Sequence, residues 1–179
     1  MRAQTININL FGGPGVGKSQ TLSGLFNKMK MQGHNTDITL EYAKELVYAK
    51  EWLKLSDQLA IAGEQHHRMF RLLGNVDYAI HDSPFIMGIQ YCCDNKIPVA
   101  HFNDFLVEQF NRYKNLNILL KRNLKFDYKT EGRLQNQEES IIIDNNIQKL
   151  LDTNKIPYHE VYVDDNVIDN IYKLIKETK

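Results

Sequence analysis

Apolar residues along the chain follow two spacings in turn. Short segments such as residues 5–11, 76–81 and 116–120 have the length of strands and are largely apolar or alternate between apolar and polar side chains. Between such segments, apolar residues recur at the i, i+3, i+4 and i+7 positions of one helix face. The first example is Leu22, Leu25, Phe26 and Met29. The pattern predicts strands that are separated by helices.

Five strands are predicted, at residues 5–11, 37–40, 76–81, 116–120 and 159–163. Helices are predicted at residues 18–32, 41–50, 56–73, 84–93, 100–113, 138–153 and 165–177. In the helix at 56–73 one apolar side is expected, made of Leu59, Ala62, His66, Met69, Phe70 and Leu73. Strands joined through helices favour right-handed crossovers and a parallel sheet. We therefore predict an α/β fold in which helices cover both faces of a five-stranded parallel sheet.

Polar residues interrupt the first predicted strand. Thr5, Asn7 and Asn9 alternate with apolar residues, although a central parallel strand is normally apolar throughout. Side-chain hydrogen bonding inside the fold is the only explanation that the sequence offers for these asparagines.

Residues 12–19 fill every required position of the phosphate-binding motif G-x-x-x-x-G-K-[ST], with Gly12, Gly17, Lys18 and Ser19. The motif follows a predicted strand and precedes a predicted helix, which is the context it requires. Its amides and the helix N-terminus receive phosphate oxygens, Lys18 reaches the β- and γ-phosphates, and Ser19 ligates Mg²⁺. We therefore predict a P-loop NTPase fold that binds ATP and Mg²⁺. The expected nucleotide contacts are Gly13, Pro14, Gly15, Val16, Gly17, Lys18, Ser19 and Gln20.

Two other interpretations of this loop are weaker. The dinucleotide pattern G-x-G-x-x-G, started at Gly13, would need glycine where Lys18 stands, so it fails. A chance glycine-rich turn would not explain the lysine, the serine and both flanking elements together.

Composition limits the class of protein. The 179 residues suit a single domain, and 22 Lys and Arg balance 22 Asp and Glu. Neutrality argues against a protein that mainly wraps nucleic acid, although a local basic groove stays open. The chain has no apolar run that could span a membrane and no signal peptide, so a cytoplasmic protein is expected. The adjacent Cys92 and Cys93 lack the spacing of a zinc site.

Functional side chains follow the strand ends, and ligands of open parallel sheets bind beyond these ends. Glu41 follows the second strand, Asp82 the third, and Lys121 and Arg122 the fourth. Together with Ser19 they have the composition of a phosphoryl-transfer site. Asp82 is predicted to hold Mg²⁺ or to orient an acceptor hydroxyl, and Glu41 is the other candidate base.

Other phosphate chemistries fit less well. In motor ATPases of the AAA type, the apolar strand that corresponds to residues 76–81 usually ends in Asp-Glu. In this chain the third predicted strand is followed by Asp82 and Ser83. A GTPase would carry Asn-Lys-x-Asp, but Asn95 and Lys96 are not followed by that aspartate. A kinase is favoured. An NTPase that drives a partner and a nucleotide-sensing module remain alternatives.

The segment 122–139 is charged and irregular, and we predict that it forms a lid whose arginines, Arg122 and Arg133, close over the transferred phosphoryl group. In the helix at 56–73, Gln65 borders the apolar face and is expected to reach the acceptor, while Arg68 is expected in solvent. Tyr42 and Ser83 are further candidate substrate contacts.

Four features together resemble a P-loop kinase family that includes the nicotinamide-riboside kinase domain of bacterial NAD-salvage proteins. They are the phosphate-binding loop, Glu41-Tyr42-Ala43, Asp82-Ser83 and Gly132-Arg133. Phage-encoded kinases of nucleosides, nucleotides or modified DNA bases are similar. The resemblance implies a kinase dependent on ATP and Mg²⁺, with a nucleoside-like small molecule or a modified base in DNA as acceptor. It also implies that Lys18 and Ser19 handle phosphates and metal, that Asp82 is catalytic, and that Arg133 belongs to the lid.

Overall fold

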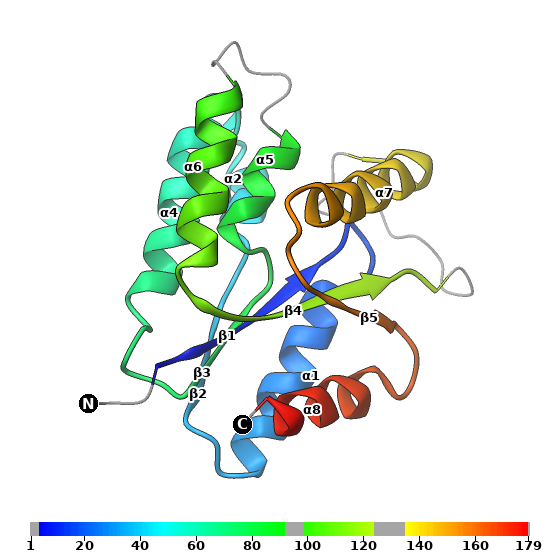
Figure 1. Ribbon diagram of the computed structural model, residues 1–179. Coiled ribbons are helices and arrows are strands. Elements are labelled where there is room, and N and C mark those ends of the chain that lie inside the picture. The colour runs from blue at the N-terminus through cyan, green and yellow to red at the C-terminus, as the bar shows by residue number, and fades with distance from the viewer. Residues whose placement is uncertain (1–3, 92–98, 124–134, 179) are drawn as a thin grey trace.

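The computed structural model describes residues 4–91, 99–123 and 135–178. Its centre is a five-stranded sheet in the order β2-β3-β1-β4-β5, and every neighbouring pair is parallel (Figure 1). The strands are β1 (Ile6–Phe11), β2 (Thr36–Thr39), β3 (Tyr78–His81), β4 (Lys114–Lys121) and β5 (His159–Tyr162). The predicted five-stranded parallel α/β fold is therefore confirmed, with strand ends that differ by one to two residues at most places.

Helices connect the strands. They are α1 (Lys18–Met31), α2 (Tyr42–Ala49), α3 (Trp52–Leu55), α4 (Gln58–Phe70), α5 (Gly88–Tyr91), α6 (Val99–Asn111), α7 (Gln137–Thr153) and α8 (Val167–Glu177). A short 3₁₀ helix, η1 (Phe85–Met87), precedes α5. The single helix predicted at 84–93 is wrong for its first part, because residues 85–87 form the tighter 3₁₀ turn; residues 92 and 93 lie outside the described ranges.

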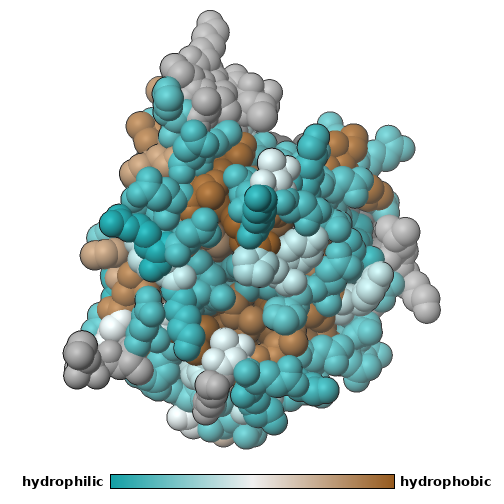
Figure 2. Space-filling view, viewed as in Figure 1, coloured by the Kyte–Doolittle hydropathy of each residue, from teal (hydrophilic) through white to brown (hydrophobic). Residues whose placement is uncertain are grey.

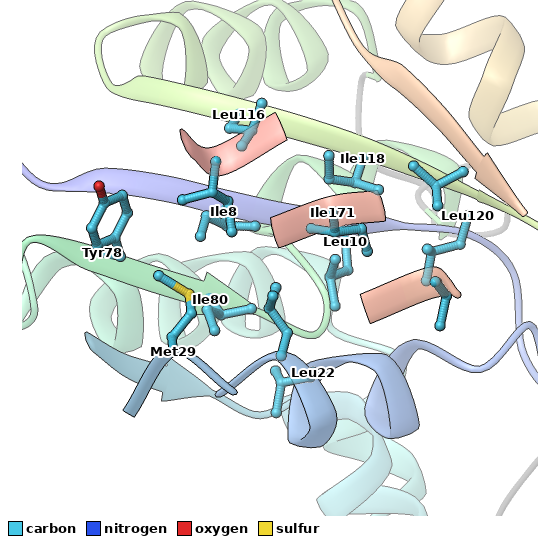
Figure 3. Packing of buried hydrophobic residues seen from close by; sticks show 14 of the residues in the cluster. Ile8, Leu10, Leu22, Met29, Tyr78, Ile80, Leu116, Ile118, Leu120 and Ile171 are labelled. Atoms are coloured by element: carbon cyan, nitrogen blue, oxygen red, sulfur yellow. The ribbon is translucent and has the colours of Figure 1, made fainter. Parts of the chain in front are cut away.

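Helices α1 and α8 cover one face of the sheet, and α4 to α7 lie on the other (Figure 1). The strands present alternate residues to the two faces, so Ile8 and Leu10 of β1 point with Ile80 of β3 toward α1 and α8. Figure 3 shows these side chains packed with Met29 and Ile171. The helical spacing predicted for α1 is confirmed, because Leu22, Leu25 and Met29 are buried. In α8, Val167, Ile171 and Ile175 are buried at the same kind of spacing.

A second apolar cluster lies under α4 to α7. Phe11 of β1 meets Phe110 of α6 edge to face, with ring centroids 6.1 Å apart, and Phe110 meets Phe85 at 5.8 Å. Leu119 of β4 and Ile147 of α7 belong to the same cluster. Edge-to-face rings satisfy the aromatic quadrupoles while excluding water. The carboxyl ends of β1 and β4 are thus held from both faces.

The buried asparagines of β1 join a polar row that crosses the sheet. His81 of β3 bonds Thr39 of β2 through Nδ1 (2.8 Å), and its Nε2 donates to Asn7 Oδ1 (3.0 Å). On the other side, Asn9 Nδ2 donates to Asn117 Oδ1 of β4 (2.9 Å). Because buried polar groups are costly unless they are hydrogen-bonded, this row specifies which strands lie side by side. It supplies the explanation that the sequence alone lacked.

The inward face of α4 differs from the predicted one. Leu59 and Phe70, expected on the apolar side, are 60% and 57% exposed. Ala62 and Met69 are buried as predicted, and Gln58, Ile61 and Gln65 are buried with them. The prediction is wrong at Leu59 and Phe70 because the true inward face includes polar glutamines, which periodicity alone assigns to a surface. Figure 2 shows hydrophobic residues scattered among hydrophilic ones on the viewed face.

His66 packs as expected for a structural histidine, with its ring centroid 5.1 Å from that of Phe85 and Nε2 2.8 Å from the Tyr113 hydroxyl. Burial lowers its pKa. Within the described ranges, no helix has the length and apolarity that crossing a bilayer requires.

Candidate active site

The phosphate-binding loop connects β1 to α1 at the carboxyl edge of the sheet. Gly17, the residue before α1, has a φ of 106°, a left-handed conformation that glycine adopts without strain. Gly12 has a φ of 151°, and a Cβ there would lie 2.6 Å from Val16 Cγ1. Both motif glycines are therefore required by the backbone itself. The loop delivers Lys18 and Ser19 to the first turn of α1.

Lys18 and Ser19 make defined contacts at this edge. Lys18 Nζ donates to the carbonyl oxygens of Gly12 (2.8 Å) and Gly13 (3.2 Å), so the ammonium lies over the loop. Ser19 Oγ donates to Asp82 Oδ2 at 2.7 Å. Gln20, Pro14 and Gly15 lie at least partly in solvent around the same loop.

Asp82 follows β3 and is only 2% exposed. Its backbone N–H donates to Thr39 O (3.1 Å), which fixes the residue against the end of β2. Within the described part of the chain, Asp82 Oδ1 is a buried oxygen without a hydrogen-bond partner. A buried carboxylate oxygen beside a serine hydroxyl fits the oxygen ligands that Mg²⁺ prefers, so the residues suit this metal. Ser83, next along the chain, is half-buried.

Glu41 precedes α2 and is half-buried. Its charge acts on Tyr91 at the end of α5. The pKa of the Tyr91 hydroxyl is raised mainly by burial, and further by the negative charges of Glu41 and Asp144. A tyrosine that two carboxylates influence lies near both, so α5 brings a hydroxyl toward the same edge as Glu41. The site thus collects groups from the ends of β2 and β3, from α5 and from α7.

Gln65 binds the chain between β2 and α2. Its Oε1 accepts from the Tyr42 N–H (3.0 Å) and its Nε2 donates to Leu40 O (3.3 Å). Gln65 is 6% exposed, and both ends of its amide are used by backbone. The side chain therefore holds the segment that carries Glu41. Its predicted contact with an acceptor stays a prediction.

Arg68 is not in solvent, so that prediction is wrong. Its side chain is 16% exposed, and it binds both carboxylate oxygens of Glu45, at 2.6 and 2.8 Å. It also contacts Glu64 and lies over the Tyr42 ring, 4.8 Å from the centroid. The Arg68 hydrogen bonds lower the pKa of Glu45. α4 was expected to point Arg68 outward, but α2 packs over that face.

Arg122 and the phosphate-binding loop meet at an aspartate of α7. Arg122 Nε donates to Asp144 Oδ2 (2.8 Å), and Nη2 donates to Pro14 O (2.8 Å). Asp144 Oδ1 in turn accepts from the Gly13 N–H at 2.6 Å. Arg122 therefore contacts the phosphate-binding loop, and its predicted role as a lid arginine stays a prediction. Arg133, the other predicted lid arginine, lies outside the described residues.

Sequence reasoning missed Asp144 and Tyr91. Asp144 had a signal, because it shares a helix face with the buried Ser140, Ile147 and Leu151 at spacings of three, four and seven. A carboxylate on an apolar face needs a partner, so it was a candidate site residue. Tyr91 had no such signal, because its surroundings depend on how α5 packs on α7.

Comparison with solved structures shows the same fold in a kinase. The chain resembles the deoxyadenosine kinase from M. mycoides with bound dATP, with a TM-score of 0.60 and 17% identity over 95% of this chain and 99% of that one. Structures of that enzyme with dCTP (TM-score 0.58, 15% identity) and with dCMP and dCDP as products (TM-score 0.58, 17% identity) are also similar; each comparison covers 96% of this chain and 99% of the other. No curated protein matches the chain significantly.

A family model described as an AAA domain matches residues 7–166, from β1 to the turn before α8. The matched region holds the phosphate-binding loop, Glu41 and Asp82. Position 83 is serine, where an AAA-type motor carries the glutamate that polarises water. The chain belongs to this AAA domain family and has the fold of a P-loop kinase.

Proposed function

We propose that the protein is a kinase that transfers the γ-phosphoryl group of ATP to a hydroxyl of a nucleoside, a nucleotide or a hydroxymethylated base. The observation that carries the proposal is the contact between Ser19 Oγ and Asp82 Oδ2 at 2.7 Å, directly after the phosphate-binding loop. The fold supports it, because the deoxyadenosine kinase structures with the same architecture hold nucleotides.

The phosphate-binding loop provides the donor side of the reaction. Amides of residues 15–19 and the N-terminus of α1 would receive the β- and γ-phosphate oxygens, because the Gly13 N–H already donates to Asp144 Oδ1 and Pro14 has no N–H. Lys18, whose Nζ lies over the loop carbonyls, would neutralise charge on the same oxygens. Ser19 and Asp82 would hold Mg²⁺, which supplies charge neutralisation at the phosphates when it is bound. Asp82 Oδ1, which is buried and has no hydrogen-bond partner among the described residues, is the oxygen that would fill this role.

The ends of β2 and β3 provide the acceptor side. The acceptor oxygen forms a bond to the γ-phosphorus while the bond to the β,γ-bridging oxygen breaks, and the hydroxyl proton passes to a carboxylate. Glu41 or Asp82 would take this proton. Gln65 supports Glu41 by fixing the backbone at Leu40 and Tyr42. Tyr42 and Ser83 remain proposed substrate contacts, and Arg133 remains a proposed lid arginine.

The role of the loop is tested by substitution of its lysine. Lys18→Ala should lower labelled-ATP turnover by orders of magnitude, because the loop loses the ammonium group that would neutralise the β- and γ-phosphates. Lys30→Ala, on the exposed side of the same helix, is the matched control and should retain turnover. An unchanged rate in Lys18→Ala would reject the role of the loop.

The roles of Asp82 and Glu41 can be distinguished by how a substitution of each changes ATP affinity and phosphoryl transfer. Asp82→Asn should keep ATP affinity within a few-fold and abolish transfer, whereas Glu41→Gln should abolish transfer only if Glu41 is the base. Equal ATP consumption with and without any acceptor would instead indicate an NTPase that works with a partner. Tight ATP binding without turnover would indicate a nucleotide-sensing module.

A further inference from the structure

The first amide of the phosphate-binding loop is bound by a side chain that is distant in sequence. Asp144 of α7 accepts the Gly13 N–H through Oδ1 at 2.6 Å. The contact is close on all sides, because a Cβ on Gly13 would lie 2.7 Å from Asp144 Oδ1 and 2.8 Å from the Ser140 carbonyl oxygen. Helix α7 therefore sets the position at which the loop leaves β1.

Arg122 completes the contact from the end of β4. It donates to Asp144 Oδ2 (2.8 Å) and to Pro14 O (2.8 Å), so one carboxylate and one guanidinium bind successive residues of the loop. The two side chains are only 10% and 22% exposed. Partly buried, charge-assisted hydrogen bonds of this kind are stronger and better oriented than surface ion pairs.

The charges of the pair also matter to an anionic ligand. A carboxylate beside a loop that receives a triphosphate would repel it unless a cation is paired with that carboxylate. Arg122 supplies the cation, and it leaves the loop close to neutral before Lys18 and the amides act. The pair has a structural part, the Gly13 and Pro14 contacts, and an electrostatic part, the cancellation of the Asp144 charge.

We propose that Asp144 and Arg122 are positioning residues for ATP binding, which hold residues 12–14 in their phosphate-receiving conformation and do not themselves contact the transferred group. The proposal rests on the proposed function, since it concerns the same triphosphate site. It assigns Arg122 a different task from that of a lid arginine, and the two tasks predict opposite outcomes in a double substitution.

The structural part is tested without nucleotide, by hydrogen–deuterium exchange of peptides that cover residues 11–20. Asp144→Ala removes the acceptor for the Gly13 N–H, and exchange there should be about tenfold faster. Asp144→Asn keeps an acceptor oxygen, so its exchange rate should lie between those of the wild type and Asp144→Ala. If the alanine variant does not fold, the comparison of Asp144→Asn with the wild type tests the structural part. Asp169→Asn is the matched control, because Asp169 of α8 is a carboxylate paired with Lys28 of α1. It should leave the exchange rate of the peptides that cover residues 11–20 unchanged.

The electrostatic part is tested by ATP affinity and by the separation of KM from kcat. Arg122→Gln leaves Asp144 charged and should weaken ATP binding about tenfold, with kcat at saturating ATP within twofold. The double variant with Arg122→Gln and Asp144→Asn should recover a large part of that ATP affinity, because the uncompensated carboxylate is removed.

Two results would overturn the proposal. One is unchanged exchange at residues 11–20 in both Asp144 variants. The other is a double variant that binds ATP as weakly as Arg122→Gln or more weakly, which would mean that Arg122 contacts the phosphates directly. A wild-type protein that does not bind ATP would count against the proposed function, while the exchange experiment would still decide whether the pair holds the loop.

Discussion

Acidification should destabilise the protein through His81. The imidazole is 2% exposed, Nδ1 lies 2.8 Å from Thr39 Oγ1, and Nε2 lies 3.0 Å from Asn7 Oδ1. Because Asn7 offers an acceptor, Nε2 carries the proton and Nδ1 accepts from the threonine hydroxyl. Both ring nitrogens are thus used in the neutral form. A second proton would force the Thr39 hydroxyl to change from donor to acceptor and would place a positive charge in the buried interior.

The magnitude follows from the pKa. Burial lowers the pKa of His81 from 6.5 to about 3, so below pH 6.5 the unfolded chain binds a proton that the folded chain does not. Stability is full above pH 6.5 and falls as the pH falls toward 3. Each pH unit in this window is worth about 1.4 kcal/mol, so the free energy of unfolding should drop by about 2 kcal/mol between pH 6.5 and pH 5.

Urea unfolding followed by circular dichroism at pH 7.5 and pH 5 measures this loss. His81→Gln is the comparison, because its amide can accept from Thr39 and donate to Asn7 without titrating. Its loss between the two pH values should be smaller than that of the wild type by about 2 kcal/mol. His66, whose pKa burial also lowers, contributes equally to both proteins. Parallel losses in the two proteins would refute the reasoning.

Three further substitutions test stability. Gly63 lies in α4, and a methyl group added there would meet no described atom within 4 Å, so Gly63→Ala should raise the free energy of unfolding by about 0.5–1 kcal/mol. The same change at Gly13 should lower it by about 1–3 kcal/mol, because the Ser140 carbonyl cannot move away cheaply. Thermal unfolding of both variants checks these opposite signs. Asn136 caps α7 in a reciprocal capping box with Glu139, so Asn136→Ala should cost about 1 kcal/mol, measured by urea unfolding. An unchanged midpoint in the last variant would show that the cap adds little.

Much of the fold could be predicted because it rests on local rules. The alternation of strand-like and helix-like segments indicated a parallel sheet, and the spacing from Leu22 to Met29 identified the buried face of α1. The proximity of Ser19 and Asp82 followed from one general rule, that the carboxyl ends of parallel strands share an edge.

The remaining features depend on packing between distant segments. Asp144 binds Gly13 across 131 residues, and no local pattern specifies how α7 lies on the loop. Gln65 is buried because the backbone at Leu40 and Tyr42 needs partners, a demand that periodicity does not register. The same holds for Asn9, whose partner on β4 became known only with the strand order.

Phosphoryl transfer itself is the most direct test of the central claim that residues 12–19 bind ATP for a kinase reaction. The protein would be incubated with γ-¹⁸O-labelled ATP, Mg²⁺ and each of several acceptors: nicotinamide riboside, deoxynucleosides, their monophosphates and hydroxymethyluracil DNA. Mass spectrometry should find the labelled phosphoryl group on one class of acceptor, and Lys18→Ala should abolish it. Label released only as inorganic phosphate, at one rate with every acceptor and with none, would contradict the account.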